Sequence, residues 1–488
     1  MLYPTLEEVK KYQNDYGTVP VCKSVYSDAY TPVQVLRKLK AVSQHCYMLE
    51  SVEDNRRWGR YTFLGYDPKL ELTCKNGKVT IDTGVKLTFE TDDPAKYIRQ
   101  VLDEYRSPKI EGMPTFTGGL TGYFSYDYMK YQEPTLKLDA KDTEGFNDFD
   151  LMLFDKVIAF DNLKQKIIFI ANVSTDEIEE NYAKAEMEID SMINLIKTGA
   201  PKQEEPLKLT SEFTSLFSEE QFCQMVEKAK KYIYEGDIFQ VVLSNRMEAK
   251  CEGSLLDAYR VLRTVNPSPY MFYFSSNDIE IAGASPETLV KLEDDVLHTF
   301  PLAGTRPRGK TPEEDKELEE GLLKDPKELA EHNMLVDLGR NDIGKISKFG
   351  TVEVEKYMEI ERYSHVMHIG STVKGIIRED MSAIDAVGSI LPAGTLSGAP
   401  KIRAAEIINE LEDNRRGIYG GAIGYIDFTG NLDTCIAIRI AYKKNGKVFI
   451  RTGAGIVADS VPETEYQETI NKGKAVVTAV KESEGGIE

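Results

Sequence analysis

The sequence lacks the features of a secreted, disulfide-stabilised or membrane-bound protein. Six cysteines are scattered over 488 residues, with no Cys-x-x-Cys pair and no histidine at zinc-ligand spacing. We therefore expect reduced thiols rather than a disulfide framework. The N-terminus is charged where a signal peptide needs an apolar stretch, and no apolar run approaches the ~20 residues that span a bilayer. These absences predict a cytoplasmic protein with no membrane partner.

Positive charge is also in short supply. The chain has 60 Lys and Arg residues against 80 Asp and Glu residues, which gives a formal net charge of −20. Nucleic acids and anionic membranes require a basic surface, so the balance argues against both as main partners. A small anionic substrate stays possible only where a cation or a local arginine offsets the acidic surface. Hydrophobic residues at 41% and charged residues at 29% are typical of a globular protein with a large core.

The distribution of turn signals predicts an α+β fold with mostly antiparallel sheet. A polar stretch over 197–214 with two prolines indicates a linker between an N-terminal unit, 1–200, and a C-terminal unit, 215–488. Helices are expected over 175–196 and 218–235. The expected strands cover 70–74, 78–82, 156–160, 166–171, 239–243, 270–274, 421–427, 435–442 and 447–452.

Two pairs of glutamates stand at helical spacing. Glu328 and Glu331 share a predicted helix face that begins at Asp325-Pro326, and Glu465 and Glu468 share another near Pro462. Carboxylates on an apolar helix face are costly unless a cation neutralises them, and two facing pairs would make an oxygen-rich site suited to Mg²⁺. The alternative is a chance spacing, which is common in so acidic a chain.

Several other features are ambiguous when each is taken alone. Glycine-rich stretches at 301–306, 392–401, 419–424 and 452–455 fit ordinary turns, but also close backbone approach to an anionic ligand. Arg439 stands in an apolar segment predicted as a strand, and a buried arginine requires an anionic partner. His368 follows His365 in a segment expected to be a strand or bend, where a lone histidine is usually structural.

Five ordered motifs resemble the chorismate-utilising enzyme family, and within it the branch that makes anthranilate (component I of anthranilate synthase). They are PLAGTRPRG at 301–309, EHNMLVDLGRND at 331–342, GTLSGAPK at 394–401, RGIYGGAIGY at 416–425 and GAGIV at 453–457. The resemblance covers nearly the whole chain. It implies a two-domain α/β sandwich of large antiparallel sheets flanked by helices, and a lyase that converts chorismate and ammonia to anthranilate and pyruvate.

The resemblance also implies a set of site residues. Mg²⁺ would be held by Glu331 and Glu468, with Glu328 and Glu465 beside them. The substrate would contact Gly304, Thr305, Tyr419, Arg439, Gly453, Ala454, Gly455 and Lys472. The catalytic residues would be Glu287, as the acid that protonates the departing hydroxyl, His368, in pyruvate elimination, Thr395 and Gln240.

Two positions separate this chain from other branches. Family members that use water carry a lysine base where Gln240 stands, and a neutral amide cannot deprotonate water, which favours ammonia as the nucleophile. Many aminodeoxychorismate synthases have lysine where Ala303 stands. Two alternatives remain: component I of an aminodeoxychorismate synthase of folate synthesis, and a non-catalytic, tryptophan-binding regulatory homologue.

Regulation and ammonia supply follow from the same resemblance. The resemblance places the family's tryptophan feedback site at the stretches 49–51 and 59–65, completed by 269–271, with Glu50, Ser51, Pro269, Tyr270 and Met271 as the candidate contacts. The alternative is a simple strand with a polar end. No cysteine has glycine at both −2 and +2, the pattern of a glutaminase nucleophile. We therefore expect a separate glutamine amidotransferase subunit in a hetero-oligomer, a heterotetramer by analogy, with free ammonia as an alternative donor.

Overall fold

In the computed structural model, which describes residues 2–51, 59–362 and 366–487, the two predicted N-terminal hairpins form where expected. Asn76 and Gly77 both take positive φ, 50° and 78°, in the two-residue turn that joins the first pair of strands. This backbone conformation suits the twist of the flanking strands, which is why Asn-Gly favours such turns. Strands 156–161 and 166–174 form the second hairpin.

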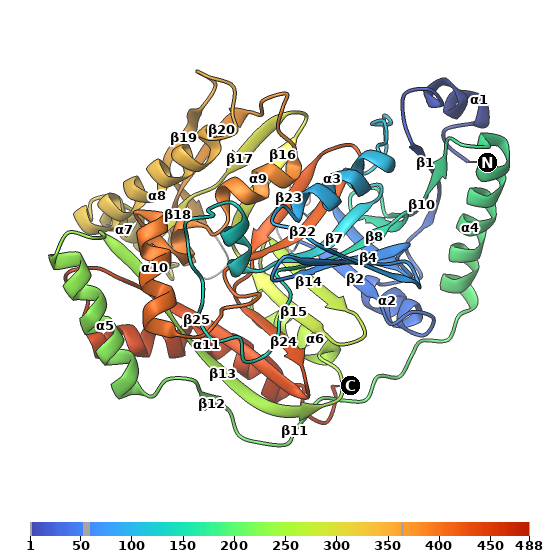
Figure 1. Cartoon of the computed structure of the whole chain (residues 1–488). Helices are drawn as coiled ribbons and strands as arrows, with labels where there is room; N and C mark the ends of the chain where they lie inside the picture. Colours follow the sequence, from blue (N-terminus) through green and yellow to red (C-terminus); the bar gives the residue numbers. More distant parts are fainter. Residues whose placement is uncertain (1, 52–58, 363–365, 488) are drawn as a thin grey trace.

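Within the described residues, the strands join into two large antiparallel sheets (Figure 1). The larger sheet follows the order β1 (Thr18–Tyr26), β10 (Lys166–Ser174), β9 (Lys156–Asp161), β3 (Tyr61–Tyr66), β2 (Cys46–Glu50), β14 (Tyr270–Ser275), β15 (Glu280–Ser285), β24 (Ile440–Lys444), β25 (Lys447–Ile456), β13 (Gln240–Glu252) and β11 (Lys208–Leu209), with β12 (Thr214–Ser215) and β21 (Gly398–Ala399) also paired to β13.

The smaller sheet follows the order β18 (Leu302–Pro307), β20 (Val366–Ile376), β17 (Val296–Thr299), β16 (Thr288–Glu293), β23 (Leu432–Ile436), β22 (Ala422–Asp427), β7 (Gly119–Phe124), β8 (Phe149–Phe154), β4 (Leu70–Lys75), β5 (Lys78–Asp82) and β6 (Lys86–Glu90), with β19 (Glu353–Arg362) paired to β20. The antiparallel α+β architecture predicted from the sequence is therefore confirmed.

Helices cover the outer sides of the two sheets (Figure 1). They are α1 (Leu6–Val9), α2 (Pro32–Lys40), α3 (Ala95–Glu104), α4 (Ile178–Thr198), α5 (Glu219–Tyr234), α6 (Leu256–Val265), α7 (Pro312–Leu322), α8 (Pro326–Gly344), α9 (Ala383–Ile390), α10 (Lys401–Glu412) and α11 (Pro462–Glu482), with 3-10 turns η1 (Lys10–Tyr12), η2 (Tyr126–Tyr131) and η3 (Gly394–Leu396). Among the described residues, no helix combines the length and the apolar character that crossing a bilayer requires.

Helix starts lie where the sequence places their caps. The Ser218 hydroxyl accepts from the Gln221 backbone amide, and the Gln221 side-chain oxygen accepts from the Ser218 backbone amide. These two hydrogen bonds fix the start of α5. Asp325 accepts from the amides of Lys327 and Glu328 at 3.0 and 3.4 Å. This cap sets the first turn of α8, and with it the place of Glu328.

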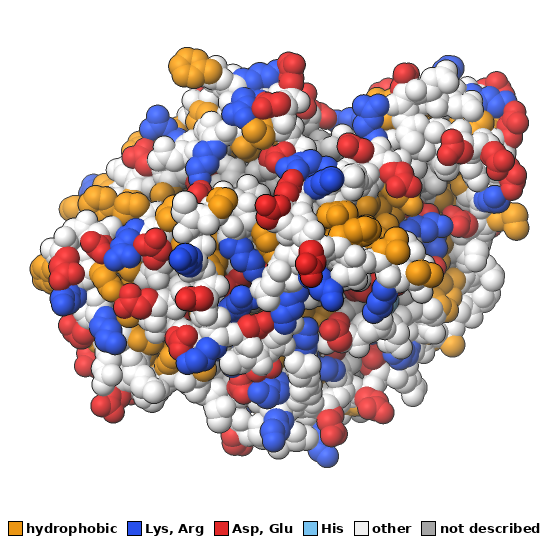
Figure 2. Space-filling model, viewed as in Figure 1, with side chains coloured by type: hydrophobic (Ala, Val, Ile, Leu, Met, Phe, Trp, Pro, Cys, Tyr) orange, Lys and Arg blue, Asp and Glu red, His pale blue; other side chains and the backbone are white. Residues whose placement is uncertain are grey.

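The hydrophobic core consists of one cluster between the two sheets and further clusters on their outer faces. An aromatic cluster between the two sheets includes Tyr47 and Phe272 from the larger sheet and Tyr123 and Phe154 from the smaller one. Separate apolar clusters lie on the outer faces: α2, α4, α6 and α11 contribute to the one on the larger sheet, and α3, α8 and α9 to the one on the smaller sheet. On the face shown in Figure 2, acidic and basic side chains are interspersed, with hydrophobic side chains exposed between them.

Each sheet combines strands from both sides of the predicted linker. In the larger sheet β2 pairs with β14, and in the smaller sheet β7 pairs with β22. The predicted boundary at 201–214 is therefore not a boundary between sheets. The assignment of 1–200 and 215–488 to separate units stays a prediction.

The predicted strand over 435–442 is wrong. The chain leaves the smaller sheet after Ile436 and enters the larger sheet at Ile440, so β23 and β24 are different strands of different sheets. Arg439 lies in this break with φ of 53°. Both flanking strands are buried, so the sequence is continuously apolar and gives no turn signal at the crossing.

Candidate active site

One cavity of about 470 Å³ collects nearly all the residues predicted for the catalytic site. It is lined by the starts of β13 and α8, by β18, β20, η3, β25 and α11, and by the crossing between the sheets. The predicted residues that line it are Gln240, Glu287, Gly304, Thr305, Glu328, Glu331, His368, Thr395, Tyr419, Arg439, Gly453, Gly455, Glu465, Glu468 and Lys472.

Glu287 is a half-buried acid in the lining of the cavity. It immediately precedes β16, and burial raises the pKa of its carboxyl from 4.5 to about 7. The Thr395 hydroxyl donates to its Oε1 at 3.1 Å, and this bond, together with the positive charges of Arg439 and Lys472, lowers the pKa in part. The carboxyl is therefore able to hold a proton near neutral pH and give it up during a reaction.

His368 on β20 is a neutral imidazole. Burial and the nearby Arg439 lower its pKa. Its Nδ1 lies 2.9 Å from the carbonyl oxygen of Gly304 and 3.2 Å from the Thr305 hydroxyl oxygen. Because a carbonyl can only accept, the proton of the neutral ring is on Nδ1, and Nε2 carries the lone pair that can take up a proton.

The four glutamates come from two helices. Burial raises the pKa of Glu331, and Glu328 one turn earlier on α8 raises it further; on α11, burial raises the pKa of Glu465, with a smaller contribution from Glu468. Lys472 forms an ion pair with Glu468 at 2.6 Å.

Carboxylates that raise one another's pKa gain most from a bound cation, and their oxygens are the ligands that Mg²⁺ prefers. In the described part of the chain, no three acidic, histidine or cysteine side chains lie close enough to hold a metal ion by themselves. Magnesium in proteins is usually held by one or two carboxylates, with water and substrate oxygens completing its shell. The donor set therefore fits magnesium shared with an anionic substrate.

Two positively charged side chains that line the cavity come from different parts of the fold. Arg439 projects from the crossing between the sheets and lies 3.4 Å from the Asn266 side-chain oxygen. Lys472 Nζ on α11 donates to the carbonyl oxygen of Gly453 at 3.0 Å. The left-handed backbone at Arg439 was not predicted, and it is what turns this side chain out of the strand direction and into the cavity.

A side chain at either cavity-lining glycine of β25 would clash with a neighbouring residue. A Cβ on Gly453 would lie 2.7 Å from the Tyr419 hydroxyl oxygen, and one on Gly455 would lie 2.6 Å from Gln240 Nε2. Ala454, between them, has its methyl group on the opposite face, buried in the cluster formed with α5 and α10. Its side chain is therefore core, and only its backbone could serve a ligand.

Gln240 opens β13 with 5% of its surface exposed. Its amide donates a hydrogen bond to Glu331. Its Oε1 is buried without a hydrogen-bond partner among the described residues. A buried acceptor left unpaired costs free energy, so this oxygen offers a place for a small hydrogen-bond donor.

A model of the chorismate binding enzymes matches residues 25–478. The chain is 46% identical to anthranilate synthase component 1 of Acetivibrio thermocellus over 99% of both chains, and 45% identical to that of Aquifex aeolicus (strain VF5) over 98% of both. The chain belongs to the chorismate-binding enzyme family. Among solved structures, anthranilate synthase component I from Streptococcus pneumoniae TIGR4 is similar with a TM-score of 0.76 and 37% identity, over 93% of this chain and 98% of that one.

A menaquinone-specific isochorismate synthase from Escherichia coli has the same fold, with a TM-score of 0.69 and 19% identity over 97% of this chain and 98% of that one. Proteins with different names therefore share this architecture. Fold alone does not choose the nucleophile, and the choice depends on side chains of the cavity.

This chorismate-binding enzyme has a second cavity, of about 250 Å³, between the two sheets. All residues predicted for the tryptophan site line it: Glu50, Ser51, Pro269, Tyr270 and Met271. The Glu50 carboxylate already accepts from Arg263 and from the Tyr259 hydroxyl. Arg60 also lines the cavity. Lys291, Tyr425 and Asp433, from strands of the smaller sheet, line it too and were not predicted, because only the folded chain brings them next to residues of the larger sheet.

Tyr270 of the second cavity contacts the segment that carries Glu287. The Tyr270 hydroxyl donates to Asp433 Oδ1 at 2.8 Å and lies 2.9 Å from the hydroxyl oxygen of Thr288. Thr288 is the neighbour of Glu287 at the start of β16. A ligand that moves Tyr270 would therefore act on the segment that carries this acid.

Proposed function

We propose that the chain is component I of an anthranilate synthase, a lyase that converts chorismate and ammonia to anthranilate and pyruvate. The observation that carries the proposal is the pair formed by Gln240 and Glu287. A neutral amide with an unpaired buried oxygen stands where a base would be needed to activate water, and an acid of pKa about 7 stands in the same cavity. The names of the most similar relatives point the same way.

Substrate binding is assigned to the positive side of the cavity. Chorismate is a dicarboxylate, and Arg439 offers a planar guanidinium that suits a carboxylate. Lys472, the Tyr419 hydroxyl and the backbone around Gly304 and Gly453 complete the polar lining. Magnesium, held by Glu331 and Glu468 with Glu328 and Glu465 beside them, would supply charge for the other carboxylate and withdraw electrons from the ring.

The proton transfers are assigned to two side chains. As ammonia adds to the ring, Glu287 gives its proton to the departing hydroxyl, which leaves as water; Thr395 stabilises the resulting carboxylate, which then takes the extra proton of the new ring ammonium. In the elimination that follows, His368 Nε2 accepts the proton of the ring carbon that bears the amine, the ether bond breaks and the ring becomes aromatic; the enolpyruvate that departs takes up a proton at its methylene carbon to give pyruvate. Gln240 Oε1 accepts a hydrogen bond from ammonia and holds it before attack.

Feedback by tryptophan is assigned to the second cavity. Its size, its aromatic and charged lining and the Tyr270 contact with Thr288 support an amino acid effector that acts on Glu287. We assign ammonia supply in the cell to a separate glutamine amidotransferase subunit, in a heterotetramer, because the sequence contains no glutaminase cysteine motif.

The test is a direct assay of the purified chain with chorismate, Mg²⁺ and an ammonium salt. We expect anthranilate fluorescence, and a lower rate when tryptophan is added. An aminodeoxychorismate product without anthranilate would assign the chain to folate synthesis instead. No turnover at any ammonium concentration, with tryptophan still bound, would indicate a non-catalytic regulatory homologue.

A further inference from the structure

Three buried charged side chains form a cluster at the catalytic cavity, and one of them, Arg451, lines it. Glu412 at the end of α10, Arg416 and Arg451 are each at most 2% exposed. The Glu412 carboxylate accepts from Arg416 Nε and Nη2 at 3.0 and 2.6 Å and from Arg451 Nη2 at 2.8 Å. It also accepts from the amide and hydroxyl of Ser244 at 2.8 and 2.9 Å. Both oxygens of the Glu412 carboxylate therefore accept hydrogen bonds.

Arg416 also donates hydrogen bonds to two backbone carbonyls outside the ion pair. Its Nη1 donates to the carbonyl oxygen of Leu396 at 2.6 Å, and its Nη2 donates to that of Val242 at 2.6 Å. Leu396 follows Thr395 in η3, and Val242 lies two residues after Gln240 in β13. One guanidinium therefore joins the two backbone segments that carry Thr395 and Gln240.

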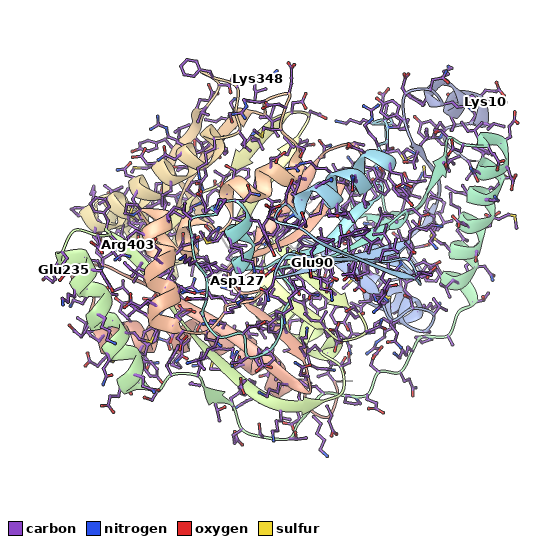
Figure 3. All side chains as sticks on the ribbon, in the orientation of Figure 1. Lys10, Glu90, Asp127, Glu235, Lys348 and Arg403 are labelled. Atoms are coloured by element: carbon purple, nitrogen blue, oxygen red, sulfur yellow. The ribbon has the colours of Figure 1, made fainter. Side chains whose placement is uncertain are left out.

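Arg416 is itself held on several sides. Its guanidinium lies over the rings of Tyr126 and Tyr419, 4.6 and 5.8 Å from their centroids. The next amide, of Gly417, donates to Asp127, which Figure 3 labels in the interior of the molecule. On the outer side, α10 is tied to the end of α5, where Figure 3 shows Arg403 close to Glu235, by an ion pair from Arg403 to Asp237 at 2.6 Å.

The turn that Arg416 contacts has few bonds of its own. Within η3 the backbone donates only from Leu396 to Ala393, at 3.0 Å, and from Ser397 to Gly394, at 3.3 Å, in the described structure. A three-residue 3-10 turn is weak, so its position depends on what it packs against. A buried ion cluster also costs desolvation that an apolar core of similar volume would avoid.

We propose that Arg416 is a positioning residue: it holds the carbonyls of Leu396 and Val242 and thereby keeps Thr395 on Glu287 and Gln240 in the cavity. The inference rests on the proposed function, because it takes Glu287 as the acid of that reaction. It assigns to Arg416 an effect on the proton transfer without any contact with the substrate.

The effect is measurable through Glu287. The Thr395 hydroxyl lowers the pKa of this carboxyl, so a turn that drifts away lets that pKa rise. Other charged groups face the same space: Arg439 and Lys472, which also lower the pKa, His368 across the cavity, and Asp342 on the side of α8. Arg416 touches none of these four through a hydrogen bond in the described structure, so the Thr395 turn is the route of its action.

The test is the pH profile of kcat for Arg416→Lys, measured with unprotonated ammonia held constant. A lysine keeps the charge beside Glu412 but cannot make both carbonyl bonds and both carboxylate bonds. We expect the alkaline limb of kcat to move up by about one pH unit, the size of one lost hydrogen bond to a carboxylate. Thr395→Val should give the same shift, and the double variant no further shift.

Arg246→Lys is the matched control. Arg246 is a buried arginine on β13, paired with Glu248 at 2.8 Å, and does not contact η3. The Arg246→Lys protein should be less stable than the wild type, and the pH profile of its kcat should not shift. Glu412→Asp is the second test variant, because a shorter carboxylate draws Arg416 away from Leu396 and should also move the limb.

A folded Arg416→Lys or Glu412→Asp protein whose profile matches the wild type would overturn the proposal. Loss of folding in both variants would overturn it too, since Arg416 would then be a structural residue. A wild-type protein that makes no anthranilate would instead refute the proposed function, so the two failures are distinguishable.

Discussion

Replacing Glu287 by glutamine should make the protein inactive and, at alkaline pH, more stable. Burial raises the pKa of this carboxyl from 4.5 to about 7 in the folded protein. Between those two values the folded state keeps a proton that the unfolded chain has released, so stability falls as the pH rises and the loss is complete above about pH 7. At about 1.4 kcal/mol per pKa unit, the ionised acid costs the folded wild type about 3 kcal/mol.

Glutamine is a close match in shape to the protonated acid and does not ionise, so it escapes this cost. The advantage of Glu287→Gln over the wild type in free energy of unfolding should grow by about 3 kcal/mol between about pH 4.5 and pH 8. In the same preparation, kcat should fall by about 10²- to 10⁴-fold, because the departing hydroxyl loses its acid. Denaturation in urea at several pH values measures the first effect, and anthranilate fluorescence the second.

The matched control is Glu280→Gln, at a buried glutamate. Burial alone would raise the pKa of Glu280, but Lys40, Lys443 and hydrogen bonds from Ser254 and Tyr273 together lower it, so that variant should be less stable than the wild type at neutral and alkaline pH. Two outcomes would refute the reasoning on Glu287: a stability difference that does not change with pH, or a variant that keeps more than about a tenth of wild-type kcat.

Three further predictions concern the effector cavity, the metal and the ammonia site. Tyr270→Phe removes the hydroxyl contact with Thr288 and should weaken tryptophan inhibition about tenfold with little change in uninhibited kcat; equal inhibition curves would contradict this coupling. Glu331→Gln should raise the Mg²⁺ concentration for half-maximal activity at least tenfold, measured by titration, and an unchanged requirement would exclude it as a ligand. Gly455→Ala brings a Cβ within 2.6 Å of Gln240 Nε2 and should lower kcat/KM for ammonia on the order of a hundredfold, with a smaller effect for chorismate; an equal loss for both would argue against the Gln240 assignment.

Local features of the fold were predictable because local chemistry decides them. The Asn76-Gly77 turn, the Ser218 capping box and the Asp325 cap each depend on one or two side chains that act on the adjacent backbone. The glutamate pairs were visible for the same reason, since helical spacing places Glu328 and Glu331 on one face.

Features that depend on crossings between sheets were not predictable from the residues. Nothing in the apolar run around Arg439 indicates a break, yet its left-handed backbone turns the arginine into the cavity. Asp433 and Lys291 reach the effector cavity only because β23 pairs with β16. Neither spacing nor the family resemblance predicted those placements, whereas most roles in the site came from the family resemblance rather than from spacing.

The most direct test of the account is the nucleophile used by the wild-type chain. Purified protein with chorismate and Mg²⁺ is assayed for products with and without an ammonium salt. The neutral Gln240 in the same cavity as Glu287 predicts anthranilate and pyruvate in equal amounts when ammonium is present, and no isochorismate when it is absent. Formation of isochorismate from water, or of a product that retains the enolpyruvyl group, would contradict the account.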